Sequence, residues 1–75
     1  MAIIRKFEEL DLKMNARHSE THGGWSVQGQ DGEFFIQINT FGSDERQMPN
    51  KVSQSLRLSK EAIEQLAELA RTKLK

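Results

Sequence analysis

The sequence predicts an α+β fold, with an antiparallel β-meander of three to four strands followed by one C-terminal amphipathic helix packed on the sheet. Two observations support this prediction. A helical pattern with a clear N-cap occupies residues 59–75, and alternating apolar and polar residues run on both sides of an Asp-Gly turn before it. The 75 residues accommodate a single domain, in which we expect the meander to span residues 22–58.

The C-terminal segment has the features of a capped amphipathic helix. Ser59 is the expected N-cap, since its hydroxyl can accept a hydrogen bond from a first-turn N–H group, and Leu58 and Ile63 have the spacing of a hydrophobic staple. Acidic residues come early in this segment and basic residues late, which suits the helix dipole. The apolar stripe that can cover the sheet consists of Ile63, Leu66, Ala70 and Leu74.

Asp31-Gly32 predicts a two-residue type I′ hairpin, because both turn positions require a positive φ. Gln30 then pairs with Glu33, and the register divides the side chains between two faces. The apolar face consists of Trp25, Val27, Phe34, Ile36 and Ile38, and we expect Trp25 to pack in the core. The polar face consists of Ser26, Gln28, Phe35, Gln37, Asn39 and Phe41.

The remaining segments are less regular. Residues 1–14 fit a helix, through Ile3, Phe7, Leu10 and Met14, and equally a short strand, through Ile3, Arg5 and Phe7. Residues 42–50 read as a loop. The strand that follows, residues 51–58, directs Val52, Leu56 and Leu58 to one side and Lys51, Ser53, Ser55 and Arg57 to the other.

Composition limits the classes of protein to consider. The chain has 11 basic and 11 acidic residues, no cysteine, and no apolar stretch of the roughly 20 residues that span a bilayer. The acids that follow Ile3-Ile4 argue against a signal peptide, and we expect a cytoplasmic protein without membrane partners. A domain this small is marginally stable without staples, so we expect a homodimer, with Ala67 and Ala70 allowing close helix approach.

No group of residues has the pattern of a catalytic centre. His18, Glu20 and His22 suggest a weak metal site, but solvated histidines are the favoured interpretation because no third fixed ligand lies near. Asp44 and Glu45 could be a pair of carboxylates for acid–base chemistry, but adjacent acids in a loop are more commonly a charged loop tip, and we favour that interpretation. We therefore expect no enzyme activity, no metal, no cofactor and no small-molecule substrate.

The polar face carries the functional hypothesis. Aromatic rings beside cations and hydroxyls suit single-stranded nucleic acid, whose bases stack while its phosphates meet charge. The residues predicted to form this site are Phe35, Gln37, Asn39, Phe41, Lys51, Ser53, Ser55 and Arg57. Two alternatives remain open: the rings pack beneath the N-terminal segment or a partner subunit, or the same face binds protein, as in a phage-type inhibitor or regulator.

The stretch from Phe34 to Leu69 resembles the single-stranded-DNA-binding transcriptional coactivators of the positive-cofactor-four type. The matching pieces are the alternating strand 35–41, the proline turn 48–51, the strand 52–58 and the helix start 59–61. The resemblance implies a curved antiparallel sheet, dimerisation through the C-terminal helices, and a role in transcription. It also implies phosphate contacts at Lys51, Ser53 and Arg57, and base stacking on Phe35 and Phe41.

Overall fold

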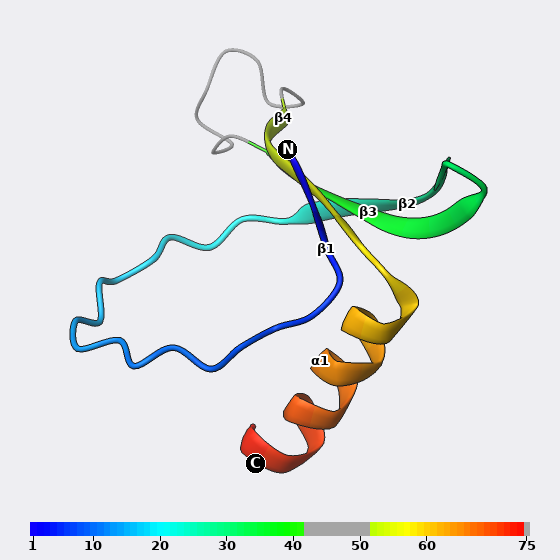
Figure 1. Cartoon of the computed structure of the whole chain (residues 1–75). Helices are drawn as coiled ribbons and strands as arrows, with labels where there is room; N and C mark the ends of the chain where they lie inside the picture. The colour runs from blue at the N-terminus through cyan, green and yellow to red at the C-terminus, as the bar shows by residue number, and fades with distance from the viewer. Residues whose placement is uncertain (42–51, 75) are drawn as a thin grey trace.

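The computed structural model describes residues 1–41 and 52–74, which form a four-stranded sheet and one C-terminal helix (Figure 1). The strands are β1 (Ala2–Ile4), β2 (Gly23–Gln30), β3 (Glu33–Phe41) and β4 (Val52–Leu58), and the helix is α1 (Lys60–Lys73). Their order across the sheet is β1-β4-β3-β2, with β2, β3 and β4 antiparallel and β1 parallel to β4. The predicted meander and C-terminal helix are confirmed.

The hairpin between β2 and β3 has the predicted turn and register. Asp31 and Gly32 have φ values of 52° and 79°, as a type I′ turn requires. Gln30 pairs with Glu33 and Val27 with Ile36, so each side chain lies on its predicted face of the sheet. The Asp-Gly pair therefore determines the register of both strands.

A register shift alters the pairing at the start of β4. Thr40 pairs with Gln54, but Phe41 pairs with Val52, so β4 carries one extra residue at this point. Because paired residues share a face, Val52 joins the face of Phe41 and lies opposite to Leu56. The prediction that Val52, Leu56 and Leu58 share one side is thus wrong at Val52.

The N-terminal segment forms a strand of only three residues, so the helical interpretation of residues 1–14 is wrong. Ala2 pairs with Leu56 and Ile4 with Leu58. The chain then follows an irregular course until β2 and swings far from the sheet (Figure 1). Leu10, Leu12 and Met14 are exposed on this excursion.

Ser59 connects the N-terminal segment, β4 and α1. Its hydroxyl accepts the Ala62 N–H (3.2 Å), which confirms it as the N-cap, and donates to the Arg5 carbonyl (3.5 Å). Its own N–H donates to the Ile4 carbonyl (3.1 Å), and the residue is fully buried. One turn further along α1, the Gln65 side-chain amide bonds both the N–H and the carbonyl of Phe7 (both 2.8 Å).

Arg5 closes the N-terminal segment over the sheet. Its guanidinium lies 5.5 Å from the centre of the Phe35 ring and forms two hydrogen bonds with the Glu33 carboxylate (3.0 and 2.9 Å). This hydrogen bonding raises the pKa of Arg5 and lowers the pKa of Glu33. The ion pair is exposed to solvent, so it adds modestly to the other contacts of the segment while Glu33 is ionised.

The core is small and lies where β3, β4 and α1 meet. Its buried hydrophobic residues, within the described part of the chain, are Phe35, Leu58 and Ala62. The first turn of α1 packs against the end of β4, and the rest of the helix extends beyond the sheet (Figure 1). Leu66 is consequently 39% exposed, so the expectation that it lies in the buried stripe is wrong.

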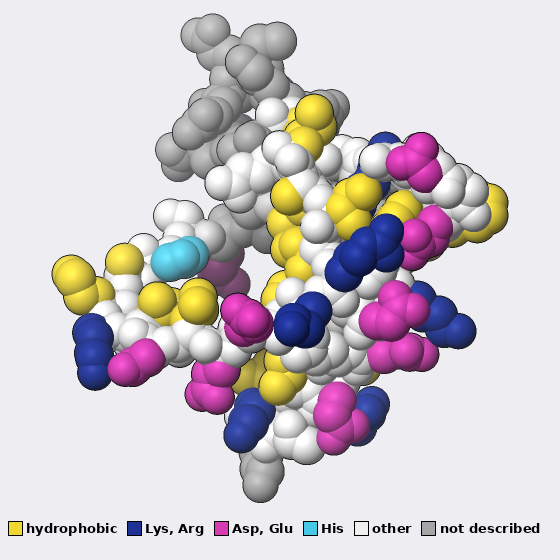
Figure 2. Space-filling view, in the orientation of Figure 1, with side chains coloured by type: hydrophobic (Ala, Val, Ile, Leu, Met, Phe, Trp, Pro, Cys, Tyr) yellow, Lys and Arg dark blue, Asp and Glu magenta, His cyan; other side chains and the backbone are white. Residues whose placement is uncertain are grey.

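The predicted apolar face is partly open for the same reason. Trp25 and Phe34 are 73% and 74% exposed, so the expectation that Trp25 packs in the core is wrong. Hydrophobic side chains are visible at the surface over the sheet and on the long N-terminal loop (Figure 2). The alternation of apolar and polar residues assigns the side chains to the correct faces of the sheet, but α1 does not extend across the apolar face.

Replacing Ser59 with alanine should lower the free energy of unfolding by about 1–2 kcal/mol, mainly because the buried Ala62 N–H loses its partner; the part-buried Arg5 carbonyl also loses a long contact. Chemical denaturation checks this value. The control is Thr72→Ala, which removes an exposed hydroxyl bonded to the Glu68 carbonyl later in the same helix. Equal losses in the two variants would contradict the role assigned to Ser59.

Acid should weaken the contact between Arg5 and Glu33. Since the folded-state pKa of Glu33 is lowered, its stabilising contribution is present above the unfolded pKa of about 4.3 and disappears as the pH falls through the folded value. Thermal unfolding of the wild type should therefore lose more stability below about pH 4.3 than unfolding of Glu33→Gln. In an Arg5→Gln background, the proteins with and without Glu33→Gln should lose the same stability as the pH falls. If they still differ, Glu33 has a partner other than Arg5.

Candidate nucleic-acid interface

The face of the sheet opposite to Trp25 gathers most of the predicted site. We call it the polar face and define it by Ser26, Gln28, Gln30, Phe35, Gln37, Asn39, Phe41, Ser55 and Arg57. By the same pairing Ile3, Glu33 and Val52 also lie on this side of the sheet. Ser26 and Arg57 both pair with Gln37, and Ser55 pairs with Asn39, so residues from three strands lie side by side. Two predicted residues are not placed: Lys51 lies outside the described residues, and Ser53 belongs to β4 but its side chain is not described.

Phe35 does not contribute an exposed ring, so its predicted role in base stacking is wrong. It is only 3% exposed and lies beneath the Arg5 guanidinium. The alternative in which the ring packs beneath the N-terminal segment is the one that the structure adopts. The physical reason is the ladder between β1 and β4, which brings Arg5 over this end of the polar face.

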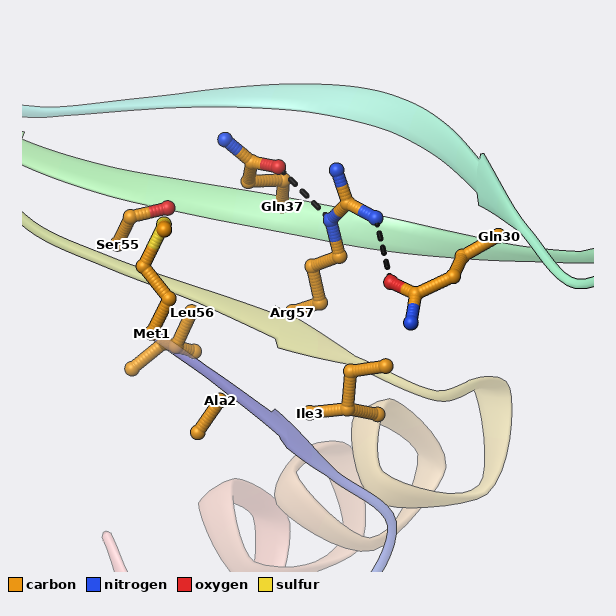
Figure 3. A pocket seen from close by; sticks show the side chains of 8 residues that line it. All are labelled: Met1, Ala2, Ile3, Gln30, Gln37, Ser55, Leu56 and Arg57. Atoms are coloured by element: carbon orange, nitrogen blue, oxygen red, sulfur yellow. Dashed lines mark hydrogen bonds between the residues drawn. The ribbon is translucent and has the colours of Figure 1, made fainter.

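Arg57 occupies the centre of the polar face in a fixed orientation (Figure 3). Its Nε donates to Gln37 Oε1 (2.9 Å), and its Nη1 donates to Gln30 Oε1 (2.8 Å). Both acceptors are neutral amides, which orient the guanidinium without neutralising it. Nη2 forms no hydrogen bond with another described residue.

Arg5 pairs with Glu33 and Arg71 with Glu68, whereas Arg57, like Arg17, Lys60 and Lys73, has no carboxylate of the described residues within ion-pair distance. Arg57 differs from these other cations because two side-chain amides hold its guanidinium. A guanidinium offers several donors in one plane, and this geometry matches carboxylate and phosphate oxygens. An external anion at Arg57 would therefore not have to displace a carboxylate of residues 1–41 or 52–74.

An open hollow of about 320 Å³ lies beside Arg57. Ser55, Gln37 and Gln30 line it together with the N-terminal strand, as the close view shows (Figure 3). The hydroxyl and the amides add neutral hydrogen-bonding groups next to the cation. The hollow thus combines the Arg57 guanidinium, the polar side chains of Gln30, Gln37 and Ser55, and the apolar side chains of Met1, Ala2, Ile3 and Leu56.

Phe41 marks the other end of the polar face. Its ring lies 5.3 Å from the His22 ring, centroid to centroid, at an interplanar angle of 41°. The ring also covers Gly24, where an added Cβ would approach it to 3.3 Å. A side chain at Gly24 would crowd this ring, so the glycine allows the close approach, and the ring is only partly buried.

Uncharged side chains fill the distance between Arg57 and Phe41. Gln37 Nε2 donates to Asn39 Oδ1 (3.1 Å), and Gln28 Nε2 donates to Ser26 Oγ (3.0 Å). Gln37 and Phe41 are four residues apart on one strand, a separation of roughly 13 Å. These internal bonds order the amides while their remaining donors and acceptors stay available.

The sequence analysis missed two residues of this site. Gln30 holds Arg57, and His22 packs against Phe41. Extending the period-two parity of β2 in both directions would have found them, because residues 22, 24, 26, 28 and 30 share one face. The sequence analysis considered His22 only as a metal ligand or as a solvated histidine, and therefore did not assign it to the polar face.

The two histidines are engaged separately. His18 Nδ1 bonds the Ala16 carbonyl (2.9 Å), and His22 faces Phe41. Within residues 1–41 and 52–74, no group of three His, Cys, Asp or Glu side chains is arranged to hold a metal ion. No helix of the described part is long and apolar enough to cross a membrane.

We compared the chain with protein families, curated proteins and solved structures. No family model, no curated protein and no solved structure matches the chain.

Proposed function

We propose that this protein is a small dimeric module that binds single-stranded nucleic acid on its polar face, as an accessory factor in transcription or DNA metabolism. The observation that carries the proposal is Arg57, a guanidinium held by two amides and not paired with any described carboxylate. The arrangement combines a phosphate-binding cation, a base-stacking ring and a strip of neutral hydrogen-bonding groups.

Arg57 is the expected phosphate contact. Gln30 and Gln37 fix the direction of its guanidinium, so little side-chain freedom is lost when an anion binds. The adjacent hollow and the Ser55 hydroxyl offer space and a further donor for phosphate oxygens. Lys51, which the sequence assigns to the same face, is proposed as a second phosphate contact.

Phe41 and His22 are the expected stacking platform. Base stacking on an aromatic side chain tolerates any sequence, because every base has a π-face. The distance of roughly 13 Å from Gln37 to Phe41 suits a short extended segment of a strand, with phosphate held at one end and a base stacked at the other. Asn39 and Gln37 then lie where sugar and base edges pass.

The dimer is supported by the size of the core. Within residues 1–41 and 52–74 the core has three buried hydrophobic residues, which is few for that many residues, and large apolar side chains remain exposed on the sheet and on α1. Small domains without disulfides commonly obtain further burial through oligomerisation. A second copy would supply this burial.

The burial of Phe35 counts against the predicted site in both of its versions. It removes a stacking ring from the nucleic-acid version and an apolar anchor from the alternative of a protein-binding polar face. The present proposal therefore rests on Arg57 and Phe41 and not on Phe35. Salt dependence separates the two functions, since phosphate binding weakens with salt along a log–log line and a buried apolar interface responds less.

Replacing Arg57 with glutamine should weaken binding of a labelled oligo-dT at low salt by roughly tenfold or more, because a charge-assisted contact is lost. The log–log salt slope should flatten by about 0.7, the value for one phosphate contact on a single strand. Fluorescence anisotropy over a KCl series measures both quantities.

Two variants control the Arg57 experiment. Arg57→Lys keeps the charge but cannot span Gln30 and Gln37, so it should keep the slope and lose part of the affinity. Arg71→Gln removes a cation paired with Glu68 on α1 and should change neither quantity. The proposed function fails if the wild type does not bind, or if Arg57→Gln and Arg71→Gln behave alike.

Replacing Phe41 with leucine should weaken the same binding about five- to a hundredfold at unchanged salt slope, because the stacking surface is lost while no charge changes. The matched control is Phe34→Leu, which alters an exposed ring on the opposite face. If Phe34→Leu weakens binding of the oligonucleotide and Phe41→Leu does not, the nucleic acid binds the apolar face, which contradicts the proposal.

A further inference from the structure

β2 is an edge strand without the usual protection. Among the described residues it pairs only with β3, and its eight residues, Gly-Gly-Trp-Ser-Val-Gln-Gly-Gln, include no charge and no proline. Natural sheets guard a long open edge with lysines, prolines or bulges, because its unpaired backbone groups attract another strand. The opposite edge, β1, has only three residues.

The hairpin determines which backbone groups of β2 face outward. Gln30 and Glu33 close a two-residue turn, so they form a hydrogen-bonded pair. Along β2 the inward and outward directions alternate, and residues 24, 26, 28 and 30 bond to β3. The N–H and carbonyl groups of residues 23, 25, 27 and 29 therefore point away from the sheet.

Large apolar side chains sit on these same outward-bonding positions. Trp25 and Val27 are 73% and 57% exposed and lie on the apolar face next to the open edge. The Phe34 ring already covers Gly29, approaching a Cβ placed there to 3.4 Å. The edge thus offers both backbone hydrogen bonds and apolar side chains to one incoming strand.

We propose that two copies of this chain pair antiparallel through β2, around a two-fold axis at Ser26. Two four-stranded sheets then join into one continuous sheet. The proposal rests on the dimeric part of the proposed function and names its interface, which is the strand edge; the resemblance had suggested the helices. It does not depend on nucleic-acid binding.

The position of the axis follows from the outward-facing residues. Centred on Ser26, residue 23 faces residue 29 of the second copy, and Trp25 faces its Val27. All four outward-facing positions then find an outward-facing partner, which makes roughly eight backbone hydrogen bonds. Moving the axis to residue 25 or 27 leaves only three such pairs, because the fourth position meets residues beyond the strand.

This register also suits the side chains. Each Trp25 gains a β-branched neighbour directly opposite, and the two Trp25 rings become diagonal neighbours across the axis, within reach of each other. No like charges meet, because β2 has none. On the other side of the sheet, Ser26 and Gln28 of the two copies extend the polar face across the junction.

The small core favours a second copy over a different protein as the occupant. The fold itself lacks burial, with three buried hydrophobic residues in the described part of the chain. Whatever covers Trp25 and Val27 must therefore be present whenever the chain is folded. An identical chain meets this condition, and its uncharged β2 edge is self-complementary.

Cysteine cross-linking tests the register directly. The chain has no native cysteine, so single-cysteine variants report one contact each. In Ser26→Cys the two cysteines face each other as a non-hydrogen-bonded pair, with Cα atoms about 4.5 Å apart, which suits a disulfide. Mild oxidation of the full chain should convert most of it to a covalent dimer on a non-reducing gel.

The matched control lies on the same strand and face. In Gln28→Cys the two cysteines are offset by four residues, roughly 13 Å, which no disulfide can span. This variant should remain uncrosslinked under the same oxidation. Equal cross-linking of the two variants, or none in Ser26→Cys, would overturn the proposed register.

Trp25 offers an independent readout, since it is the only tryptophan of the chain. Its emission should shift to shorter wavelength as protein concentration rises, in step with dimer formation measured by sedimentation velocity. Val27→Lys places a charge at the edge and should shift both curves to at least tenfold higher concentration. Circular dichroism confirms that the variant is folded.

The outcomes separate this inference from the proposed function. A dimer that persists unchanged in Val27→Lys but dissociates in Ala70→Glu would place the interface on α1, overturning the inference and leaving a dimer. A wild-type monomer at high concentration would overturn both the interface and the dimer. Binding of oligo-dT is tested separately by the Arg57 variants.

Discussion

The rest of the structure depends on the hydrogen bonds of one buried residue, Ser59. Its N–H extends the β1–β4 ladder to Ile4, and its hydroxyl both caps α1 and bonds the Arg5 carbonyl. Three segments that are distant in sequence therefore meet at one side chain. A polar group that is buried in this way needs hydrogen-bond partners for its donors and acceptors, because an unpaired buried group costs about 1–3 kcal/mol.

The junction at Ser59 determines which part of the polar face is buried. By placing Arg5 over Phe35 it converts one end of that face into core, and the Arg5–Glu33 pair closes it. The binding site that we propose is therefore limited to the stretch between Arg57 and Phe41. The two arginines differ in their partners. Arg5 is paired with the Glu33 carboxylate, whereas Arg57 is held by two amides and has no carboxylate of the described residues within ion-pair distance.

The same junction leaves the other face incomplete. α1 leaves β4 at the end of the sheet, so only its first turn packs against the core, and Trp25 and Val27 stay exposed. Among the described residues, no segment covers these two side chains. Pairing of β2 edges would use that exposure, since it joins the open backbone groups and the apolar side chains of two copies.

The sequence by itself determined most of the fold: the Asp31-Gly32 turn, the hairpin register, the two faces of the sheet and the Ser59 cap. Each of these depends on residues close together in the chain. It also placed Arg57 and Phe41 on one face, but not Gln30 as a partner of Arg57. Only the tertiary structure decided that Phe35 is buried and Trp25 exposed. Alternation shows which residues share a face, whereas the cover of each face depends on segments from distant parts of the chain.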